Sequence, residues 1–161
     1  MGTFTFQYFK DHGKGKLARV ETSETRIPLN IFAEKGSDCD LAAGEVCEIQ
    51  VCGVGSGFSF FDSEEAFKAK NGNFATMSMI PIGTFPSDEN DANGEESCHI
   101  LFSGMVLHSQ FDPDAPEPNA RLFVQTLDMM IIVGTNLDKP VEPLSIVSGV
   151  AWIYGDVKRK A

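Results

Sequence analysis

The sequence lacks any run of about 18 apolar residues, the length that a membrane-spanning helix requires. Residues 1–10 also lack a basic start followed by an apolar block, so they do not predict a secretory signal. We therefore expect a cytoplasmic protein that makes no contact with a membrane.

The sequence also lacks the spacings that common chemical sites need. It has 4 cysteines and 3 histidines, but no Cys-x-x-Cys or His-x-x-x-His pair and no Gly-Lys-Ser/Thr loop. Cys98 and His99 are the one adjacent pair of a nucleophile and a base, and neighbours on a strand point to opposite sides. We predict no catalytic residue, metal ligand or cofactor, and a small cysteine- or metal-dependent enzyme is the least favoured alternative.

Positive charge is scarce, with 13 Lys and Arg against 23 Asp and Glu and a net charge of −10. Both ends of the chain are net positive, so the body, residues 21–157, is more acidic than the whole. A surface of this sign repels a phosphate backbone and attracts basic partners. The charge thus predicts a protein partner with a basic surface and makes nucleic acid an unlikely ligand; it indicates no oligomeric state.

Apolar segments with strand-forming residues are abundant, and the clearest are 99–108, 121–133 and 144–154, each bounded by turn residues. Residues 44–53 alternate between apolar and polar, as a half-buried strand does. The one convincing helix spans about 63–70, with Asp62 or Ser63 as its N-cap. The sequence therefore predicts a mainly β protein, an antiparallel β-barrel with one short helix.

We expect residues 1–161 to form a single domain. Within it, residues 1–96 would supply N-terminal strands and the helix, 97–157 the barrel strands, and 158–161 a basic tail. The acidic segment 86–96 has no apolar periodicity and marks the boundary between the first two parts.

A strand, a hairpin and a returning strand with glycines at positions 104 and 149 resemble the OB-fold, a five-stranded, partly open barrel. Residues 61–67, 80–83, 100–104 and 147–153 also resemble a group of small uncharacterised bacterial proteins. These resemblances imply a fold and carry no named family and no activity.

The OB-like interpretation implies a ligand surface on the central hairpin. Arg121, Phe123 and Gln125 share one face of this hairpin, and Trp152 and Tyr154 share a face of the last strand. Such side chains stack on, and form hydrogen bonds with, a base, a sugar or a peptide; alternatively, the large aromatics belong to the core. We expect a binding or interaction protein without catalytic activity, or alternatively an oligonucleotide- or saccharide-binding OB-like module.

Overall fold

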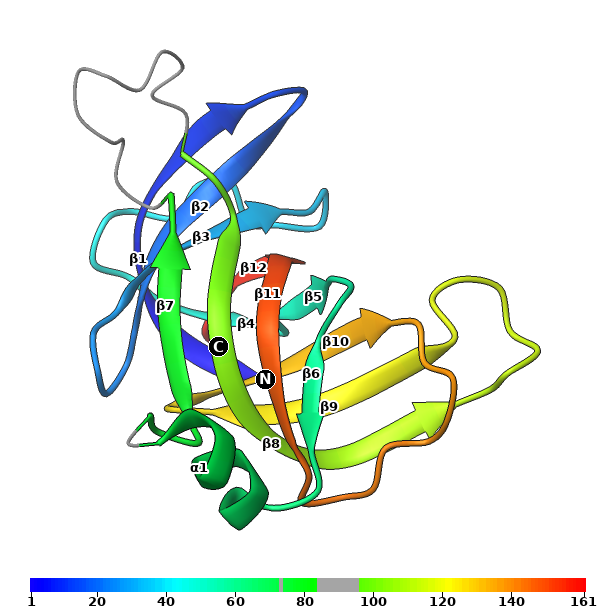
Figure 1. Ribbon diagram of the computed structural model, residues 1–161. Coiled ribbons are helices and arrows are strands. Elements are labelled where there is room, and N and C mark those ends of the chain that lie inside the picture. Colours follow the sequence, from blue (N-terminus) through cyan, green and yellow to red (C-terminus); the bar gives the residue numbers. More distant parts are fainter. Residues whose placement is uncertain (73, 84–95) are drawn as a thin grey trace, which may run out of the picture. The chain divides into compact units, whose positions relative to one another are not determined.

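The computed structural model describes residues 1–72, 74–83 and 96–161. The protein is mainly β, with 54% of residues in strands and 5% in helix, which confirms the predicted fold class. The predicted boundary segment 86–96 lies outside the described residues except for Glu96. The elements, labelled in Figure 1, are β1 Gly2–His12, β2 Gly15–Thr22, β3 Pro28–Ala33, β4 Val46–Ile49, β5 Cys52–Val54, β6 Ser59–Phe61, α1 Glu64–Asn71, β7 Ser78–Ile82, β8 His99–Phe111, β9 Ala120–Thr126, β10 Met129–Thr135, β11 Ile146–Gly155 and β12 Val157–Arg159.

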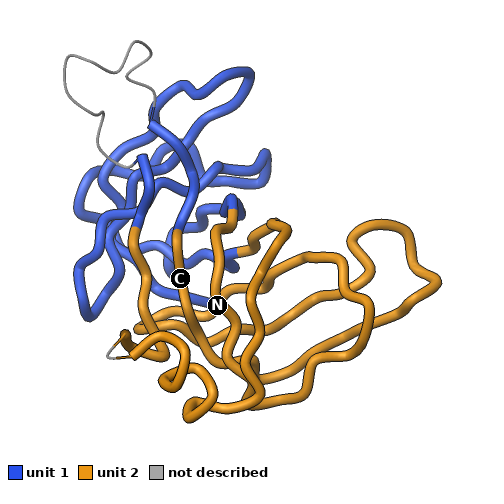
Figure 2. Tube along the Cα trace, in the orientation of Figure 1, with its two compact units in different colours: residues 1–51, 81–100, 152–161 blue, residues 52–80, 101–151 orange. Residues whose placement is uncertain are grey.

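The chain forms two compact units, coloured separately in Figure 2. Unit 1 comprises residues 1–51, 81–100 and 152–161, and unit 2 comprises residues 52–80 and 101–151. The sequence assigns the barrel strands to residues 97–157, whereas the structure gives 97–100 and 152–157 to unit 1 and the rest to unit 2.

Unit 1 contains a closed, five-stranded mixed barrel. Its strands follow the order β12-β4-β1-β2-β3-β11. Only Asp156 separates β11 from β12, so the two form one bent strand that pairs with β3 at one end and β4 at the other. The β3–β11 pair is parallel and the other pairs of this barrel are antiparallel. A closed barrel of five strands is consistent with the OB-like resemblance.

The bend in the last strand depends on Gly155. A Cβ at this position would lie 2.7 Å from the carbonyl oxygen of Gln50, too close for any side chain. Fully buried apolar residues from all five strands fill the interior, and they are Phe4, Phe6, Val20, Leu29, Ile31, Cys47, Ile49 and Ile153. Burial of these residues gives the barrel a continuous apolar core.

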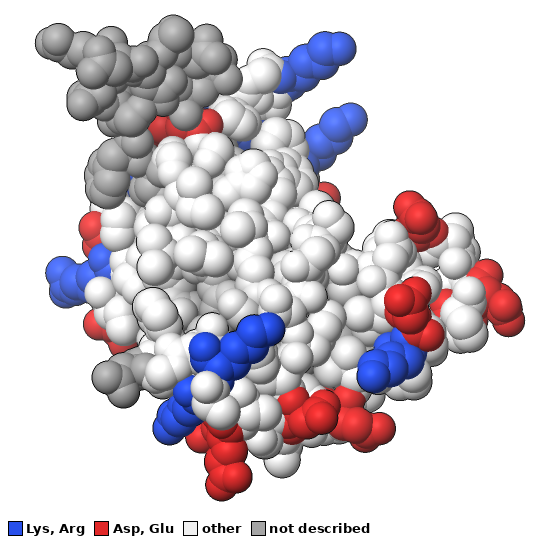
Figure 3. All heavy atoms as spheres, in the orientation of Figure 1, with Lys and Arg blue, Asp and Glu red and all other residues white. Residues whose placement is uncertain are grey.

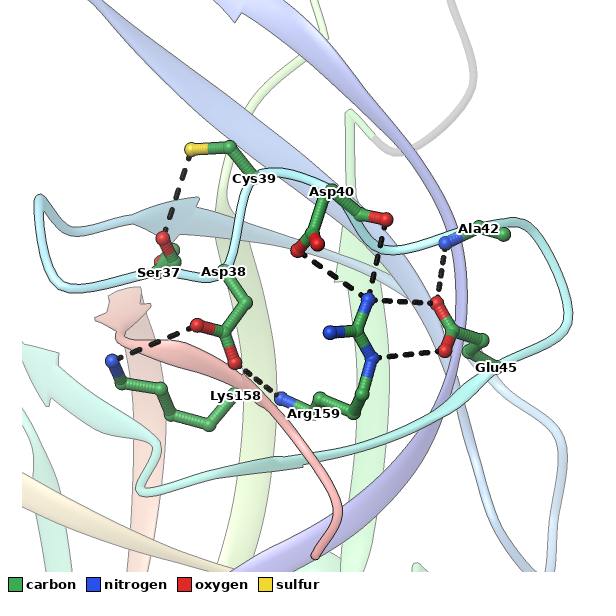
Figure 4. A network of polar contacts seen from close by, with 8 residues as sticks. All are labelled: Ser37, Asp38, Cys39, Asp40, Ala42, Glu45, Lys158 and Arg159. Carbon is green, nitrogen blue, oxygen red and sulfur yellow. Dashed lines mark hydrogen bonds and ion pairs between the residues drawn. The ribbon is translucent and has the colours of Figure 1, made fainter.

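A polar network fixes β12 to the segment between β3 and β4 (Figure 4). The backbone N–H of Arg159 donates to Asp38 at 2.8 Å, and that of Val157 donates to Ser37 Oγ at 2.9 Å. The Arg159 guanidinium donates to Glu45 at 3.0 Å and lies 3.3 Å from a carboxylate oxygen of Asp40. Residues 158 and 159, assigned by the sequence to a basic tail, thus take part in closing the barrel.

Unit 2 is built around the β9–β10 hairpin, which turns at Leu127 and Asp128. β8 pairs antiparallel with β9, and β5 pairs parallel with β10. Helix α1 begins as predicted: Ser63 is its N-cap, and the Ser63 hydroxyl accepts a hydrogen bond from the N–H of Ala66 at 3.1 Å. The described part of the chain contains no helix with the length and hydrophobicity of a membrane span.

Candidate ligand-binding face of the barrel

The outer face of β1, β2 and β3 carries a polar row made of Tyr8, Arg19 and Asn30. Tyr8 is the cross-strand partner of Arg19, and Arg19 is the partner of Asn30. Directly paired residues lie on the same face of a sheet. The flanking residues Val20 and Ile31 belong to the barrel core, so the row lies on the opposite side of the sheet, where Arg19 and Asn30 are also buried.

An aromatic cluster of Phe32, Trp152 and Tyr154 continues this face onto β11. Phe32 is the cross-strand partner of Tyr154. Ring centroids of Phe32 and Trp152 lie 5.3 Å apart, and those of Trp152 and Tyr154 lie 5.3 Å apart in a stacked arrangement. Gly15 makes room for the Phe32 ring, because a Cβ there would lie 2.6 Å from it. All three aromatic residues are half-buried, so each exposes part of its side chain.

Arg19 is held firmly within the polar row. Its Nε donates to Asn30 Oδ1 at 2.7 Å, and its guanidinium carbon lies 5.5 Å from the centre of the Tyr8 ring. Asn30 Nδ2 donates to the carbonyl oxygen of Ser97 at 3.2 Å. Arg19 is only 5% exposed and Asn30 3%, so this cation has a fixed position.

Glu96 lies against Arg19 and Lys10. One Glu96 oxygen is 3.6 Å from Arg19 Nη2 and the other is 3.6 Å from Lys10 Nζ. Glu96 is 7% exposed. Its Oε2 is buried and makes no hydrogen bond with any of the described residues. The carboxylate is therefore held by charge, at distances longer than the 2.7–2.9 Å typical of hydrogen-bonded ion pairs.

A basic hairpin borders the outer face at the β1–β2 turn. Lys10, His12, Lys14 and Lys16 lie within seven consecutive positions, and the three lysines are exposed. In Figure 3, Lys and Arg side chains project at the upper right, the region of the β1–β2 hairpin in Figure 1. In an OB-fold the loop between the first two strands and the face of strands 2 and 3 contact the ligand. The corresponding parts of this barrel carry the lysines, the polar row and Phe32.

The five predicted binding residues belong to two separate surfaces. Trp152 and Tyr154 lie in the aromatic cluster of unit 1, whereas Arg121, Phe123 and Gln125 lie on β9 in unit 2. As predicted, the last three share one face. Arg121 is exposed, and the other two are half-buried.

The unit 2 surface is partly committed to internal contacts. Gln125 Nε2 donates to the carbonyl oxygens of Leu127 and Met129, at 3.0 and 3.1 Å, and so stabilises the hairpin turn. Phe123 packs beside His108, with ring centroids 5.4 Å apart. A hollow of about 260 Å³ borders Arg121, and its other lining residues come from 110–120.

Phe32, Arg19, Asn30 and Glu96 were not predicted from the sequence as site residues. The strand-forming residues of β3 do not identify the strands that pair with it. The candidate face depends on the pairing of β2 with β3, the pairing of β3 with β11, and the ion pair of Glu96 with Arg19. The last two join residues that are far apart in sequence, which a local pattern cannot predict.

Unit 2 contains a separate cavity of about 800 Å³. It lies between β6 and the segment that follows β10. Its lining residues are Gly57, Phe58, Phe60, Asp62, Thr135, Asn136, Leu137, Asp138, Lys139, Pro140, Val141, Glu142 and Ser145. This volume is in the range of small-molecule sites, although the lining shows no pairing of a nucleophile with a base.

The cysteines are poorly suited to nucleophilic chemistry. Burial raises the pKa of the Cys47 thiol to about 11 and that of Cys98 to about 12, with Glu45 and Glu96 respectively adding to the shift. Thiols with such pKa values are protonated at neutral pH and are weak nucleophiles. No cluster of three or more His, Cys, Asp or Glu side chains able to hold a metal ion occurs among residues 1–72, 74–83 and 96–161.

Comparison of the chain with known protein families, with curated proteins and with solved structures finds no match.

Proposed function

We propose that the protein is a non-catalytic binding protein that holds a single-stranded oligonucleotide on the outer face of its barrel. The observation that carries the proposal is the aromatic cluster of Phe32, Trp152 and Tyr154 on strands β3 and β11. An OB-fold uses this side of the barrel for oligonucleotides and oligosaccharides.

Stacking supplies the first part of the binding energy. Bases stack on aromatic side chains irrespective of sequence, and each such contact contributes about 1–3 kcal/mol. The cluster offers three half-buried rings in contact, with Trp152 stacked on Tyr154 and Phe32 tilted against Trp152. Its members are fixed by strand pairing, so little conformational entropy is lost when a ligand binds.

Charge supplies the second part. The whole chain is acidic, and unit 1 carries nine basic and 14 acidic side chains; five of the acidic ones lie in residues 81–100, and the balance is nine to nine in residues 1–51 and 152–161, which contain the barrel strands. The exposed lysines of the basic hairpin lie at the edge of the outer face, where they would contact backbone phosphates. Local charge, rather than the net charge of −10, is what a ligand at this face meets within a Debye length of about 10 Å.

Trp152 makes the proposal directly testable, because it is the one tryptophan of the chain. A dT oligonucleotide of about ten nucleotides is titrated into the protein while Trp152 fluorescence is recorded at several salt concentrations. We expect saturable quenching and an affinity that falls as salt is raised. A fluorescence change with a neutral oligosaccharide, and none with the oligonucleotide, would overturn the proposal in favour of saccharide binding.

Phe32→Ala is the sharpest variant, because it removes one ring and keeps the reporter. We expect it to weaken oligonucleotide binding about 5- to 150-fold, as the loss of one stacking contact does. Phe123→Ala is the matched control: it removes a half-buried aromatic from the alternative face formed by Arg121, Phe123 and Gln125. If Phe123→Ala lost affinity and Phe32→Ala did not, the ligand would bind to that face of unit 2 instead.

A further inference from the structure

We propose that Arg19 and Lys10 form a site for one backbone phosphate of the ligand, and that the Glu96 carboxylate occupies this site in the free protein. The inference rests on the proposed function and deepens it, because it identifies a charged contact and an internal competitor for it. Glu96 lies 3.6 Å from each of the two cations.

Arg19 is positioned as an anion-binding residue before any ligand arrives. Its Nε is occupied by Asn30 Oδ1 at 2.7 Å, and the Tyr8 ring lies beside its guanidinium. These contacts fix the plane of the group, while Nη2 is directed toward Glu96. A fixed, planar guanidinium is the side chain best suited to bind a phosphate.

Glu96 fits this position poorly. Both of its ion-pair distances exceed those of a charge-assisted hydrogen bond. Its buried Oε2 accepts no hydrogen bond from the described residues. A buried oxygen that accepts no hydrogen bond destabilises the protein. Replacing the Glu96 carboxylate with an anion that accepts hydrogen bonds from both Arg19 and Lys10 would therefore be favourable.

A phosphate meets these requirements. Its oxygens project in several directions, so that one group is able to accept from Arg19 and Lys10 at the same time. Lys10 is 51% exposed at its side chain and gives the incoming anion a first contact from solvent. Glu96 would then rotate away from the cations as the phosphate takes its place.

The site lies within reach of the aromatic cluster. Asn30 and Phe32 are two residues apart on β3 and share the outer face, which separates them by roughly 6.6 Å along the strand. Arg19 is the cross-strand partner of Asn30. A phosphate bound by Arg19 is thus adjacent to a base stacked on Phe32, as consecutive parts of one nucleotide chain are.

The decisive experiment compares Glu96→Gln with Glu48→Gln. Glu48 lies on β4 of the same unit, so its variant removes the same charge from another part of the barrel. We expect Glu96→Gln to bind the dT oligonucleotide about tenfold more tightly than the wild type. Glu48→Gln measures how much the affinity for the oligonucleotide rises when any one negative charge of the barrel is removed. We expect this rise to be no more than about twofold.

A methylphosphonate oligonucleotide, which has an uncharged backbone, separates this inference from the proposed function. The gain of Glu96→Gln should vanish with this probe, while stacking still quenches Trp152. If the wild type binds neither probe, the proposed function fails. If both probes bind but the gain of Glu96→Gln equals that of Glu48→Gln, or persists with methylphosphonate, the phosphate site is wrong and the function stands.

Removal of Arg19 completes the test. Arg19→Gln alone leaves Glu96 buried beside one cation fewer and is expected to unfold more easily. The double variant Arg19→Gln/Glu96→Gln replaces both charges of the pair with neutral amides. We expect it to fold, as its melting temperature would show, and to bind the oligonucleotide no more tightly than the wild type. If the double variant bound the oligonucleotide as tightly as Glu96→Gln does, Arg19 would not be part of the phosphate site.

Discussion

Unit 1 and unit 2 both present half-buried aromatics on outward strand faces, but the surroundings of these aromatics differ. Phe32 adjoins two more rings and a row containing Arg19, with lysines at the border. Phe123 adjoins His108 and a glutamine whose amide supports a turn. The Phe32 surface thus combines three adjoining half-buried rings with exposed lysines at its border, whereas the glutamine beside Phe123 supports the hairpin turn.

The two units carry the same net charge. Unit 2, residues 52–80 and 101–151, carries nine acidic and four basic side chains, and unit 1, residues 1–51, 81–100 and 152–161, carries 14 acidic and nine basic side chains, so each has a net charge of −5. Figure 3 shows many of the acidic side chains over the lower and right part of the view, which Figure 2 assigns to unit 2. The expectation of a partner with a basic surface therefore does not distinguish unit 2 from unit 1.

The largest expected effect concerns whether the two units unfold separately. Ile31→Ala empties a core position of unit 1 and Ile131→Ala one of unit 2, and both residues are fully buried. Each change should cost about 2–5 kcal/mol of unfolding free energy. If residues 1–161 form a single domain, calorimetry will show one transition that both variants lower. Two transitions, each moved by one variant, would contradict the single-domain prediction.

A smaller effect should come from the basic hairpin. Lys14→Glu combined with Lys16→Glu reverses two exposed charges. We expect oligonucleotide affinity to fall by about tenfold or more. The slope of log affinity against log salt concentration should become shallower by the equivalent of about two phosphate contacts. Lys68→Glu combined with Arg121→Glu reverses two exposed charges of unit 2 and should leave both quantities nearly unchanged. Equal effects of the two changes would show that net charge alone controls binding.

The smallest effect concerns the polar network around Arg159. Its hydrogen bond to Glu45, with help from the N–H of Ala42, lowers the pKa of Glu45 from its ordinary value of 4.5. A carboxylate with a lowered pKa stabilises the folded state above its unfolded pKa, and this contribution is lost as the pH falls through the folded value. Glu45→Gln should therefore lower the melting temperature slightly at neutral pH and not at strongly acidic pH.

The control for this prediction is Glu142→Gln, which changes an exposed carboxylate of unit 2. Its melting temperature should follow that of the wild type across the same pH range. A difference between Glu45→Gln and wild type that grows as the pH falls would contradict the proposed direction of the pKa change.

Local features of the fold were predictable from local sequence. The predicted helix 63–70 corresponds to α1 Glu64–Asn71, capped by Ser63. The strand 99–108 corresponds to most of β8, and the hairpin within 121–133 turns at Leu127 and Asp128. Capping groups, turn residues and alternation act over a few residues, so the sequence displays them directly.

Long-range features were not predictable in this way. Trp152 and Tyr154 share a face, as expected, but their neighbour Phe32 is reached through the parallel pairing of β3 with β11. Arg19 and Glu96 are joined across strands and a connecting segment. Parallel pairing and ion pairs between distant residues depend on the folded chain as a whole, so the polar row and its carboxylate emerge only from the structure.

The fifth strand of the barrel is separated from the fourth by residues 50–145. During synthesis, β1 to β4 therefore leave the ribosome long before β11 and β12 exist to pair with β3 and β4. Until then, two strand edges offer unpaired N–H and C=O groups, which favour association with other chains. A translation product that stops before Trp152 has every strand of the barrel except the closing one, and it would be a target for chaperones or for aggregation.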